Sequence, residues 1–247
     1  MLTIVNEKRK QKTVCPSPFI LHFPMSVLIF ANGTVPADAP PGWLLPYLAQ
    51  ATLTIAADGG LRYLRALGRW PDVLVGDLDS LPPTGRAEMD ALPALSRPTV
   101  RQYPAGKDET DLELALLYAV QATQDEPILV FAALGGRLDQ ALANVLLLAH
   151  PALRGRVVRL VEPFQQAWLV RDQTTIHGRA GDRVSLIPLG GAAEIAYTTG
   201  LAWPLRAETL DFGPARGISN VMETDTAVVT LQSGLLLCVH TDGGWQR

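Results

Sequence analysis

Val73-Leu74-Val75-Gly76-Asp77-Leu78-Asp79-Ser80 is an apolar run that ends in two carboxylates. The apolar part predicts a buried strand, and both acids follow directly after its carboxyl end. Two carboxylates this close together are unfavourable unless a positive charge lies between them. Magnesium is usually held by one or two carboxylates together with substrate phosphates. The stretch therefore predicts a site for a divalent cation that carries a polyphosphate, placed at the end of a strand.

A second charged segment, Lys107-Asp108-Glu109-Thr110-Asp111, follows further along the chain. Thr110 and Glu113 fit a capping box at a helix start, and a carboxylate is favourable at that end of a helix. Capping does not account for the whole group of acids, nor for Lys107, which is the only lysine after residue 12. We interpret the segment as a metal and phosphate site, with a solvated charged turn as the alternative.

The pattern between Met25 and Pro163 alternates strand and helix. Apolar runs predict strands at residues 27–31, 53–57, 73–75, 128–133 and 157–161. Apolar residues spaced i, i+3, i+4, i+7 predict helices over residues 112–119 and 138–145. This alternation predicts a Rossmann-like α/β domain at residues 25–163, with a mainly parallel sheet covered on both faces.

The pattern changes after Pro163, where short runs rich in Val, Ile, Thr and Leu are separated by glycine-rich turns. Strands are expected at residues 183–187, 194–198, 227–231 and 235–240. The Gln232-Ser233-Gly234 turn predicts a hairpin between the last two. We therefore expect a boundary near residues 163–166 and a small all-β domain at residues 164–247.

Composition excludes several classes of protein. A hydrophobic content of 48% suffices for a sizeable core, and a net charge of −3 argues against a nonspecific nucleic-acid surface. We find no apolar run long enough to span a membrane. Cys15 and Cys238 show neither a pairing pattern nor metal-knuckle spacing, so we expect a reducing, cytoplasmic location.

Residues 1–24 differ from the rest of the chain and carry three of its four lysines. We interpret them as a disordered tail or a mis-assigned start. A signal peptide is the alternative, but Pro16, Pro18 and Pro24 leave no apolar core of adequate length.

Several expected strands of the first domain end in glycines or polar residues. These ends are Asn32-Gly33, Asp58-Gly59-Gly60, Gly76-Asp77 and Gly135-Gly136-Arg137. Ligands of open α/β sheets bind in the crevice outside the carboxyl ends of the strands, where glycines let backbone N–H groups approach a phosphate. One such end alone would be a tight turn, whereas four together favour a site that binds a phosphate-bearing ligand. Neither a GxGxxG nor a GxxxxGK[ST] motif is present.

Three further features are ambiguous by themselves. Arg137 suits a phosphate, which it can hold with two parallel hydrogen bonds, and Asp139 beside it could equally cap a helix. Trp203 before Pro204 is usually a packing residue, and Ser219-Asn220 after a glycine is usually a turn.

Taken together, these segments resemble the thiamine pyrophosphokinase family. The resemblance covers nearly everything from Met25 onward. It rests on five short motifs in order, namely Asp58-Gly59-Gly60, residues 76–80, residues 107–111, Gly135-Gly136-Arg137-Leu138-Asp139 and Gly217-Ile218-Ser219-Asn220. It implies an α/β nucleotide-binding domain, a C-terminal β-sandwich and a homodimer with active sites between the subunits. Gln140 departs from the histidine that many bacterial members carry.

The resemblance also implies an activity, in which pyrophosphate is transferred from ATP to thiamine to give thiamine diphosphate and AMP. The catalytic and Mg²⁺-binding residues would be Asp77, Asp79 and Asp111. The ATP-binding residues would be Asp58, Gly59, Ser80, Lys107, Asp108, Thr110, Gly135, Arg137 and Asp139. Trp203, Ser219 and Asn220 would bind thiamine, with the indole face against the aromatic cation. Neither nucleic acid nor a membrane is an expected partner.

Two alternatives stay open on the sequence. The first is a diphosphotransferase with the same α/β domain that acts on another alcohol, such as a hydroxymethylpterin. The second is a nonenzymatic nucleotide or vitamin sensor. The three acids Asp77, Asp79 and Asp111 are intact, which argues against the sensor.

Overall fold

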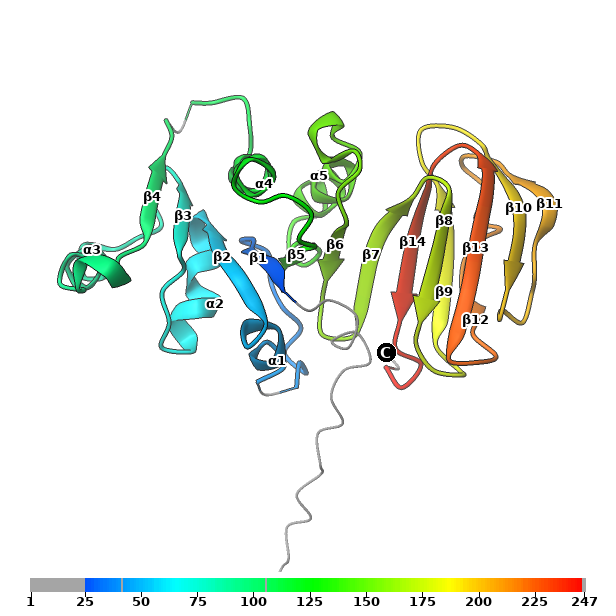
Figure 1. Cartoon of the computed structure of the whole chain (residues 1–247), viewed down its shortest axis with the longest axis horizontal. Helices are drawn as coiled ribbons and strands as arrows, with labels where there is room; N and C mark the ends of the chain where they lie inside the picture. Colours follow the sequence, from blue (N-terminus) through cyan, green and yellow to red (C-terminus); the bar gives the residue numbers. More distant parts are fainter. Residues whose placement is uncertain (1–24, 41, 105, 246–247) are drawn as a thin grey trace, which may run out of the picture.

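The computed structural model describes residues 25–40, 42–104 and 106–245, so the expected tail at residues 1–24 lies outside the described part. Within it, a ten-stranded sheet has the order β12-β9-β14-β7-β6-β5-β1-β2-β3-β4, and a four-stranded sheet has the order β11-β10-β13-β8 (Figure 1). The helices lie at the β1–β6 end of the large sheet, and the small sheet lies at the other end (Figure 1).

The first six strands form the parallel part of the large sheet. They are β1 (Ser26–Phe30), β2 (Ala51–Ala57), β3 (Val73–Gly76), β4 (Thr99–Gln102), β5 (Ile128–Phe131) and β6 (Val158–Val161). Successive strands from β1 to β4 extend the sheet one way, whereas β5 and β6 lie on the other side of β1. The sheet therefore has a topological switch point between β1 and β5, and the expected α/β fold class is confirmed.

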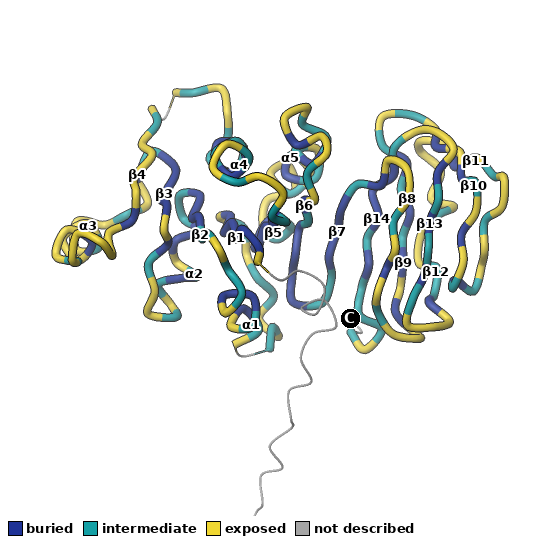
Figure 2. Tube along the Cα trace, viewed as in Figure 1, coloured by how far each residue is buried: buried dark blue, intermediate teal, exposed yellow. Residues whose placement is uncertain are grey.

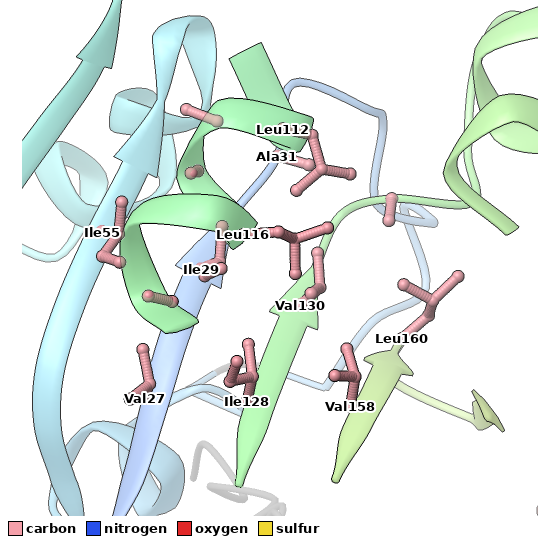
Figure 3. Packing of buried hydrophobic residues seen from close by; sticks show 14 of the residues in the cluster. Val27, Ile29, Ala31, Ile55, Leu112, Leu116, Ile128, Val130, Val158 and Leu160 are labelled. Carbon is pink, nitrogen blue, oxygen red and sulfur yellow. The ribbon is translucent and has the colours of Figure 1, made fainter. Parts of the chain in front are cut away.

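Helices cover both faces of this parallel part. They are α1 (Leu45–Leu48), α2 (Leu61–Ala66), α3 (Pro83–Asp90), α4 (Asp111–Ala122) and α5 (Leu138–Leu147), with short 3₁₀ helices at Asp58–Gly60, Ala94–Ser96 and Pro151–Leu153. Alternate residues of a strand face opposite sides of a sheet. On one side, Leu116 of α4 points toward Ile29 and Val130, and Leu112 lies next to Ala31 (Figure 3). On the other, Phe30 packs in the cluster that holds residues of α1 and α2.

The remaining strands form a β-sandwich. They are β7 (Gln165–Val170), β8 (Gln173–His177), β9 (Arg183–Pro188), β10 (Ala193–Thr199), β11 (Arg206–Leu210), β12 (Asn220–Val221), β13 (Thr226–Ser233) and β14 (Leu236–Thr241). Here the large sheet is antiparallel, and it shares an apolar core with the small sheet that includes Trp168, Leu186, Ile195 and Val229. The expected all-β C-terminal part is confirmed.

The large sheet is continuous through the expected domain boundary. β6 and β7 pair antiparallel through Leu160 with Ala167 and Val161 with Gln166. Residues 163–166 thus span the turn and the first residues of β7, where the sheet changes from parallel to antiparallel. The division into domains at this point stays a prediction.

The hairpin expected around Gln232-Ser233-Gly234 is wrong. β13 pairs with β8 and β10 in the small sheet, whereas β14 pairs with β7 and β9 in the large sheet. Val229 and Cys238 are both buried in the sandwich core, so the two strands face each other across that core. The physical reason is that the turn at Gly234 leads the chain from the small sheet to the large one, so the apolar faces of β13 and β14 pack toward each other across the core instead of pairing edge to edge.

Two elements carried a weak or misleading sequence signal. All four residues of β4 are exposed at the sheet edge, so the sequence there has no apolar run that would predict a strand. The spacing over residues 138–145 correctly predicts a helix, but Leu138, Leu142 and Leu146 of α5 are exposed. Figure 2 shows exposed stretches in the α5 region. No helix in the described ranges is long and apolar enough to cross a membrane.

The packing of α4 on the sheet predicts a difference between two leucines. Leu116 is 3% exposed and Leu138 is 82% exposed. Leu116→Ala should lower the free energy of unfolding by about 3 kcal/mol, because it leaves a cavity above Ile29 and Val130. Leu138→Ala is the matched control and should change it by less than about 0.5 kcal/mol. Urea unfolding followed by circular dichroism measures both, and equal effects would contradict the packing described here.

Candidate active site

A cavity of about 570 Å³ opens at the carboxyl ends of β1, β2, β3 and β5. Its walls are the loops that follow these strands and the starts of α4 and α5. The lining residues include Asn32, Gly33, Asp58, Asp77, Lys107, Asp111, Gly135, Gly136 and Arg137. All four polar strand ends singled out in the sequence therefore meet in one place, at the switch point of the sheet.

Three carboxylates gather at the edge of this cavity. Asp58, Asp77 and Asp79 each place one oxygen within 4.8 Å of the others. Leu78 explains how two neighbouring acids of one segment reach the same place. Its side chain is buried, its φ is +65°, and the Asp79 N–H donates to Asp77 Oδ1 at 3.2 Å. The chain thus turns sharply over a buried leucine and turns both acids outward.

The charges of this cluster favour a cation. The negative charge of Asp77, followed by partial loss of water and the charge of Asp58, raises the pKa of Asp79 above its ordinary value. Asp58 Oδ1 is buried and lacks a hydrogen-bond partner among the described residues. Carboxylate oxygens are hard ligands that suit magnesium, calcium or manganese. The residues present therefore fit a hard divalent cation.

Lys107 and Asp111 form an ion pair beside the cluster. Lys107 Nζ lies 2.8 Å from Asp111 Oδ1, and only 11% of the lysine side chain is exposed. The hydrogen bond to Asp111 raises the pKa of Lys107, and the charges of Asp77 and Asp58 act in the same direction. Lys107 is therefore positively charged next to the carboxylates. Thr110 caps α4 as expected, since its hydroxyl accepts from the Glu113 N–H at 3.1 Å.

The cluster differs in one member from the metal-binding set expected above. Asp58 lies with Asp77 and Asp79, whereas Asp111 contacts Lys107. Asp111 borders the cluster across Gly76, where an added Cβ would lie 3.3 Å from Asp111 Oδ1 and 3.2 Å from Asp58 Cβ. Asp111 is thus near the carboxylates but separated from them by backbone.

The other expected ATP-binding residues lie in different surroundings. Gly59 and Ser80 line a neighbouring cavity of about 300 Å³ rather than the large one. Asp108 is exposed. Arg137 lines the large cavity, but its guanidinium holds Asp139 with two hydrogen bonds. That ion pair raises the pKa of Arg137 and lowers the pKa of Asp139.

Two of the three expected thiamine-binding residues, Trp203 and Asn220, line a separate cavity of about 250 Å³ in the β-sandwich. Trp203 is 63% exposed and lines it together with Asn220. The Asn220 side chain accepts from the Trp203 N–H at 3.1 Å and donates to the Trp203 carbonyl at 2.7 Å. An ion pair between Glu208 and Arg216 forms another part of the wall. Ser219 is exposed, and its N–H donates to Ser185 Oγ at 3.0 Å.

The two cavities are far apart in space within one chain. Asp77 follows β3 and Asn220 begins β12, and seven strands separate β3 from β12 in the large sheet. At about 4.8 Å between neighbouring strands, this corresponds to roughly 40 Å along the sheet. A small ligand cannot contact both places within a single chain.

Comparison with known proteins gives the same family for both parts of the chain. The family model "Thiamin pyrophosphokinase, catalytic domain" matches residues 44–159, and "Thiamin pyrophosphokinase, vitamin B1 binding domain" matches residues 173–236. Together they match well over half of the chain. The chain belongs to the thiamine pyrophosphokinase family.

Individual relatives support this assignment. Thiamine pyrophosphokinase 3 of Oryza sativa subsp. japonica is 27% identical over 83% of this chain and 82% of its own length. Thiamine pyrophosphokinase of Bacillus subtilis is 27% identical over 80% of this chain and 91% of its own length. The crystal structure of the Bacillus subtilis protein superimposes with a TM-score of 0.75, covering 88% of this chain and 99% of that one.

Each of the two thiamine pyrophosphokinase models matches the part of the chain that contains one of the two cavities. The carboxylate cluster, Lys107 and Asp111 fall within residues 44–159, which the catalytic model matches. Trp203 and Asn220 fall within residues 173–236, which the vitamin B1 binding model matches. Each cavity therefore lies within the range that one of the two family models matches.

Arg62 supports the site but was not identified from the sequence. Its guanidinium donates to the carbonyls of Asn32 at 3.1 Å, Gly33 at 2.6 Å and Gly59 at 3.2 Å. It also donates to Asn32 Oδ1, and Asn32 Nδ2 lies 3.4 Å from Asp58 Oδ2. Arg62 thus ties together the loops after β1 and β2. Its position just after Asp58-Gly59-Gly60 was the one available signal, and an arginine in a first helical turn usually faces solvent.

Glu162 is a second residue that the sequence did not reveal. It follows β6, between the two matched ranges, and is only 3% exposed. Its Oε1 accepts from the N–H groups of Ala133 and Leu134, both at 3.0 Å. Loss of water on burial raises the pKa of Glu162 to about 7, although these two N–H groups lower it.

The raised pKa of Glu162 predicts how stability varies with pH. The folded value of about 7 lies above the ordinary value of 4.5, so the folded state holds the proton more tightly. This contribution is fully present below pH 4.5 and is lost as pH rises to about 7. Wild type should therefore lose about 3 kcal/mol between pH 4.5 and 7.5 relative to Glu162→Gln, which does not titrate. Urea unfolding of both proteins across this range measures the difference, and parallel curves would contradict it.

Proposed function

We propose that this chain transfers pyrophosphate from ATP to the hydroxyl group of thiamine, giving thiamine diphosphate and AMP. The observation that carries the proposal is the cluster of Asp58, Asp77 and Asp79 beside Lys107, at the switch-point cavity of a chain in this family. Clefts at such switch points are the usual ligand sites of open α/β sheets.

In this reaction the thiamine hydroxyl oxygen forms a bond to the β-phosphorus of ATP. The bond between that phosphorus and the oxygen bridging the α- and β-phosphates breaks, AMP leaves with that oxygen, and the hydroxyl proton is released. The transition state of such transfers is loose, so catalysis depends mainly on positioning and charge neutralisation. None of the residues in the cavity is required to act as a strong general base.

Asp58, Asp77 and Asp79 are the residues that would hold Mg²⁺, with Asp111 next to them across Gly76. Bound there, the ion would offset the negative charge of the phosphate oxygens. Lys107 and Arg137 add positive charge at the same cavity. Gly135 packs against the Thr34 carbonyl so closely that an added Cβ would lie 1.8 Å from its oxygen. A side chain is excluded at this position, so the loops after β1 and β5 pack directly against each other at the cavity.

Trp203 would receive thiamine, because an exposed indole is the best protein surface for an aromatic cation. Asn220 fixes the Trp203 backbone through its side-chain amide, so in this proposal it holds the indole in place. Ser219 is exposed beside it and completes the proposed contact surface.

We also propose a homodimer in which each active site combines the carboxylates of one chain with Trp203 of its partner. The separation of roughly 40 Å along the sheet supports this arrangement, because one chain cannot bring both to the same thiamine. A twofold dimer would form two equivalent sites of this kind. A reducing, cytoplasmic location is also proposed, from the two cysteines, of which Cys238 is buried.

Neither alternative is favoured by a specific observation. The vitamin B1 binding model matches the β-sandwich, which gives no reason to prefer a pterin. The carboxylate cluster is intact, which gives no reason to prefer a sensor without activity.

The first test is turnover with and without the carboxylate cluster. Purified protein with ATP, Mg²⁺ and thiamine should release AMP and thiamine diphosphate, measured by chromatography. Asp79→Asn should lower kcat by about a hundredfold or more, because the cluster loses one charge that faces the metal. Asp125→Asn, at an exposed carboxylate in a distant loop, is the control and should leave kcat unchanged. Release of ADP would contradict the function, and a loss below about threefold would contradict the metal-binding role.

The second test is complementation between two inactive chains. Asp79→Asn and Trp203→Ala should each be nearly inactive alone. If carboxylates and indole come from different subunits, random mixing after denaturation and refolding should restore about a quarter of wild-type activity, since half of the dimers then hold one intact site. Wild type that is denatured and refolded in the same way is the control for activity lost during refolding. Absence of restored activity from a mixture shown to contain heterodimers would place each site within one chain.

A further inference from the structure

The loop after β5 forms one wall of the ATP cavity proposed above. Ala133, Gly135, Gly136 and Arg137 of this loop all line the cavity. The loop lies at the switch point, against the loop that follows β1. Its shape therefore decides where backbone groups meet the bound nucleotide.

This loop has an unusual backbone that its surroundings must hold. Ala132 has a φ of +55°, and Gly136 has a φ of +100°. An alanine in the left-handed region is unfavourable by about 1 kcal/mol, so such a residue persists only when neighbouring contacts fix it. The loop does not hold this shape by local preference alone.

Contacts from three directions hold the loop. The Gly33 N–H donates to the Ala132 carbonyl at 2.8 Å, and the Thr34 N–H donates to the Gly135 carbonyl at 3.1 Å. Asn144 of α5 donates to the Ala133 carbonyl at 2.8 Å. From the side of β6, Glu162 Oε1 accepts the N–H groups of both Ala133 and Leu134 at 3.0 Å.

Burying Glu162 as the acceptor for these two N–H groups is costly in free energy. It is 3% exposed, and its second oxygen, Oε2, is buried without a hydrogen bond among the described residues. Burial of a carboxylate is unfavourable unless both oxygens are well paired. Its burial also raises its pKa to about 7. Both hydrogen bonds that its Oε1 accepts come from the loop after β5, and this geometry indicates a role in shaping the loop.

We propose that Glu162 is a positioning residue for ATP, which holds the Ala132–Gly136 backbone in the shape that accepts the nucleotide. It acts through the N–H groups of Ala133 and Leu134 and does not itself line the cavity. The inference rests on the proposed function for the identity of the nucleotide. It goes beyond that function in assigning a task to a residue outside both matched ranges.

The test compares three substitutions of Glu162. Glu162→Leu removes the acceptor, Glu162→Asp withdraws it by one methylene, and Glu162→Gln keeps one oxygen in place for both N–H groups. The KM for ATP should rise about tenfold or more in Glu162→Leu, rise less in Glu162→Asp, and stay within about threefold of wild type in Glu162→Gln. The KM for thiamine should stay within about twofold in all three, because the loop after β5 contains none of the residues proposed to contact thiamine.

Asp182 offers a matched control in the β-sandwich. It is another buried carboxylate that accepts two backbone N–H groups, those of Arg179 and Gly243 at 2.9 Å each. Asp182→Asn should lower thermal stability without changing the KM for ATP. If it raises that KM as much as Glu162→Leu does, general loss of stability explains the effect and the proposal is wrong.

Calorimetry with a non-hydrolysable ATP analogue and MgCl₂ separates this inference from the proposed function. Wild type should bind the analogue, and Glu162→Leu should bind it about tenfold more weakly. If wild type binds the analogue but releases no AMP with thiamine, the proposed function is wrong. The comparison of analogue binding between wild type and Glu162→Leu still tests the role of Glu162. Equal binding by wild type and Glu162→Leu would overturn the proposal. Failure of both Glu162→Leu and Glu162→Asp to fold would assign Glu162 to stability and would also overturn it.

Discussion

Mutual repulsion among Asp58, Asp77 and Asp79 is the constraint around which the α/β part of this protein is built. β2 and β3 pair in parallel with Ala57 opposite Val75, so the residues that follow both strands are neighbours. Register in a sheet is fixed by which side chains pack on each face, and a slip by one residue would exchange Val73 and Val75 with Leu74, which packs in a different core on the opposite face. The apolar packing under the sheet therefore holds three like charges together, and that arrangement favours a cation between them.

Positive groups and backbone contacts then stabilise the strand ends around this cluster. Lys107 approaches from the start of α4 and is held by Asp111, which fixes the position of its charge. Arg62 holds the loops after β1 and β2 through their carbonyl oxygens, and Glu162 holds the loop after β5 through its N–H groups. An arginine supplies only donors and a carboxylate only acceptors, so each residue type matches the backbone groups that its loop presents.

The sequence was sufficient for features that depend on local pattern, and insufficient for those that depend on which strands become neighbours. Buried apolar runs such as Val73-Leu74-Val75 predict the strands, and glycines and acidic residues predict where the strands end. β4 could not be found, because an exposed edge strand carries no apolar signal. The place of Asp58 in the cluster follows from the pairing of β2 with β3, and the role of Glu162 follows from the pairing of β5 with β6. Neither pairing can be derived from residues that lie close together in the chain.

Continuity of the large sheet also limits how the proposed reaction can occur. A flexible linker between two domains would let Trp203 approach the carboxylates of its own chain. Instead, β6 and β7 are hydrogen-bonded to each other, so the ladder continues from the parallel strands into the sandwich. Breaking that ladder to fold one part onto the other would expose buried residues such as Leu160 and Ala167. The continuous ladder that holds the carboxylates in register therefore opposes closure within one chain, which is why the proposed reaction draws its indole from a second copy.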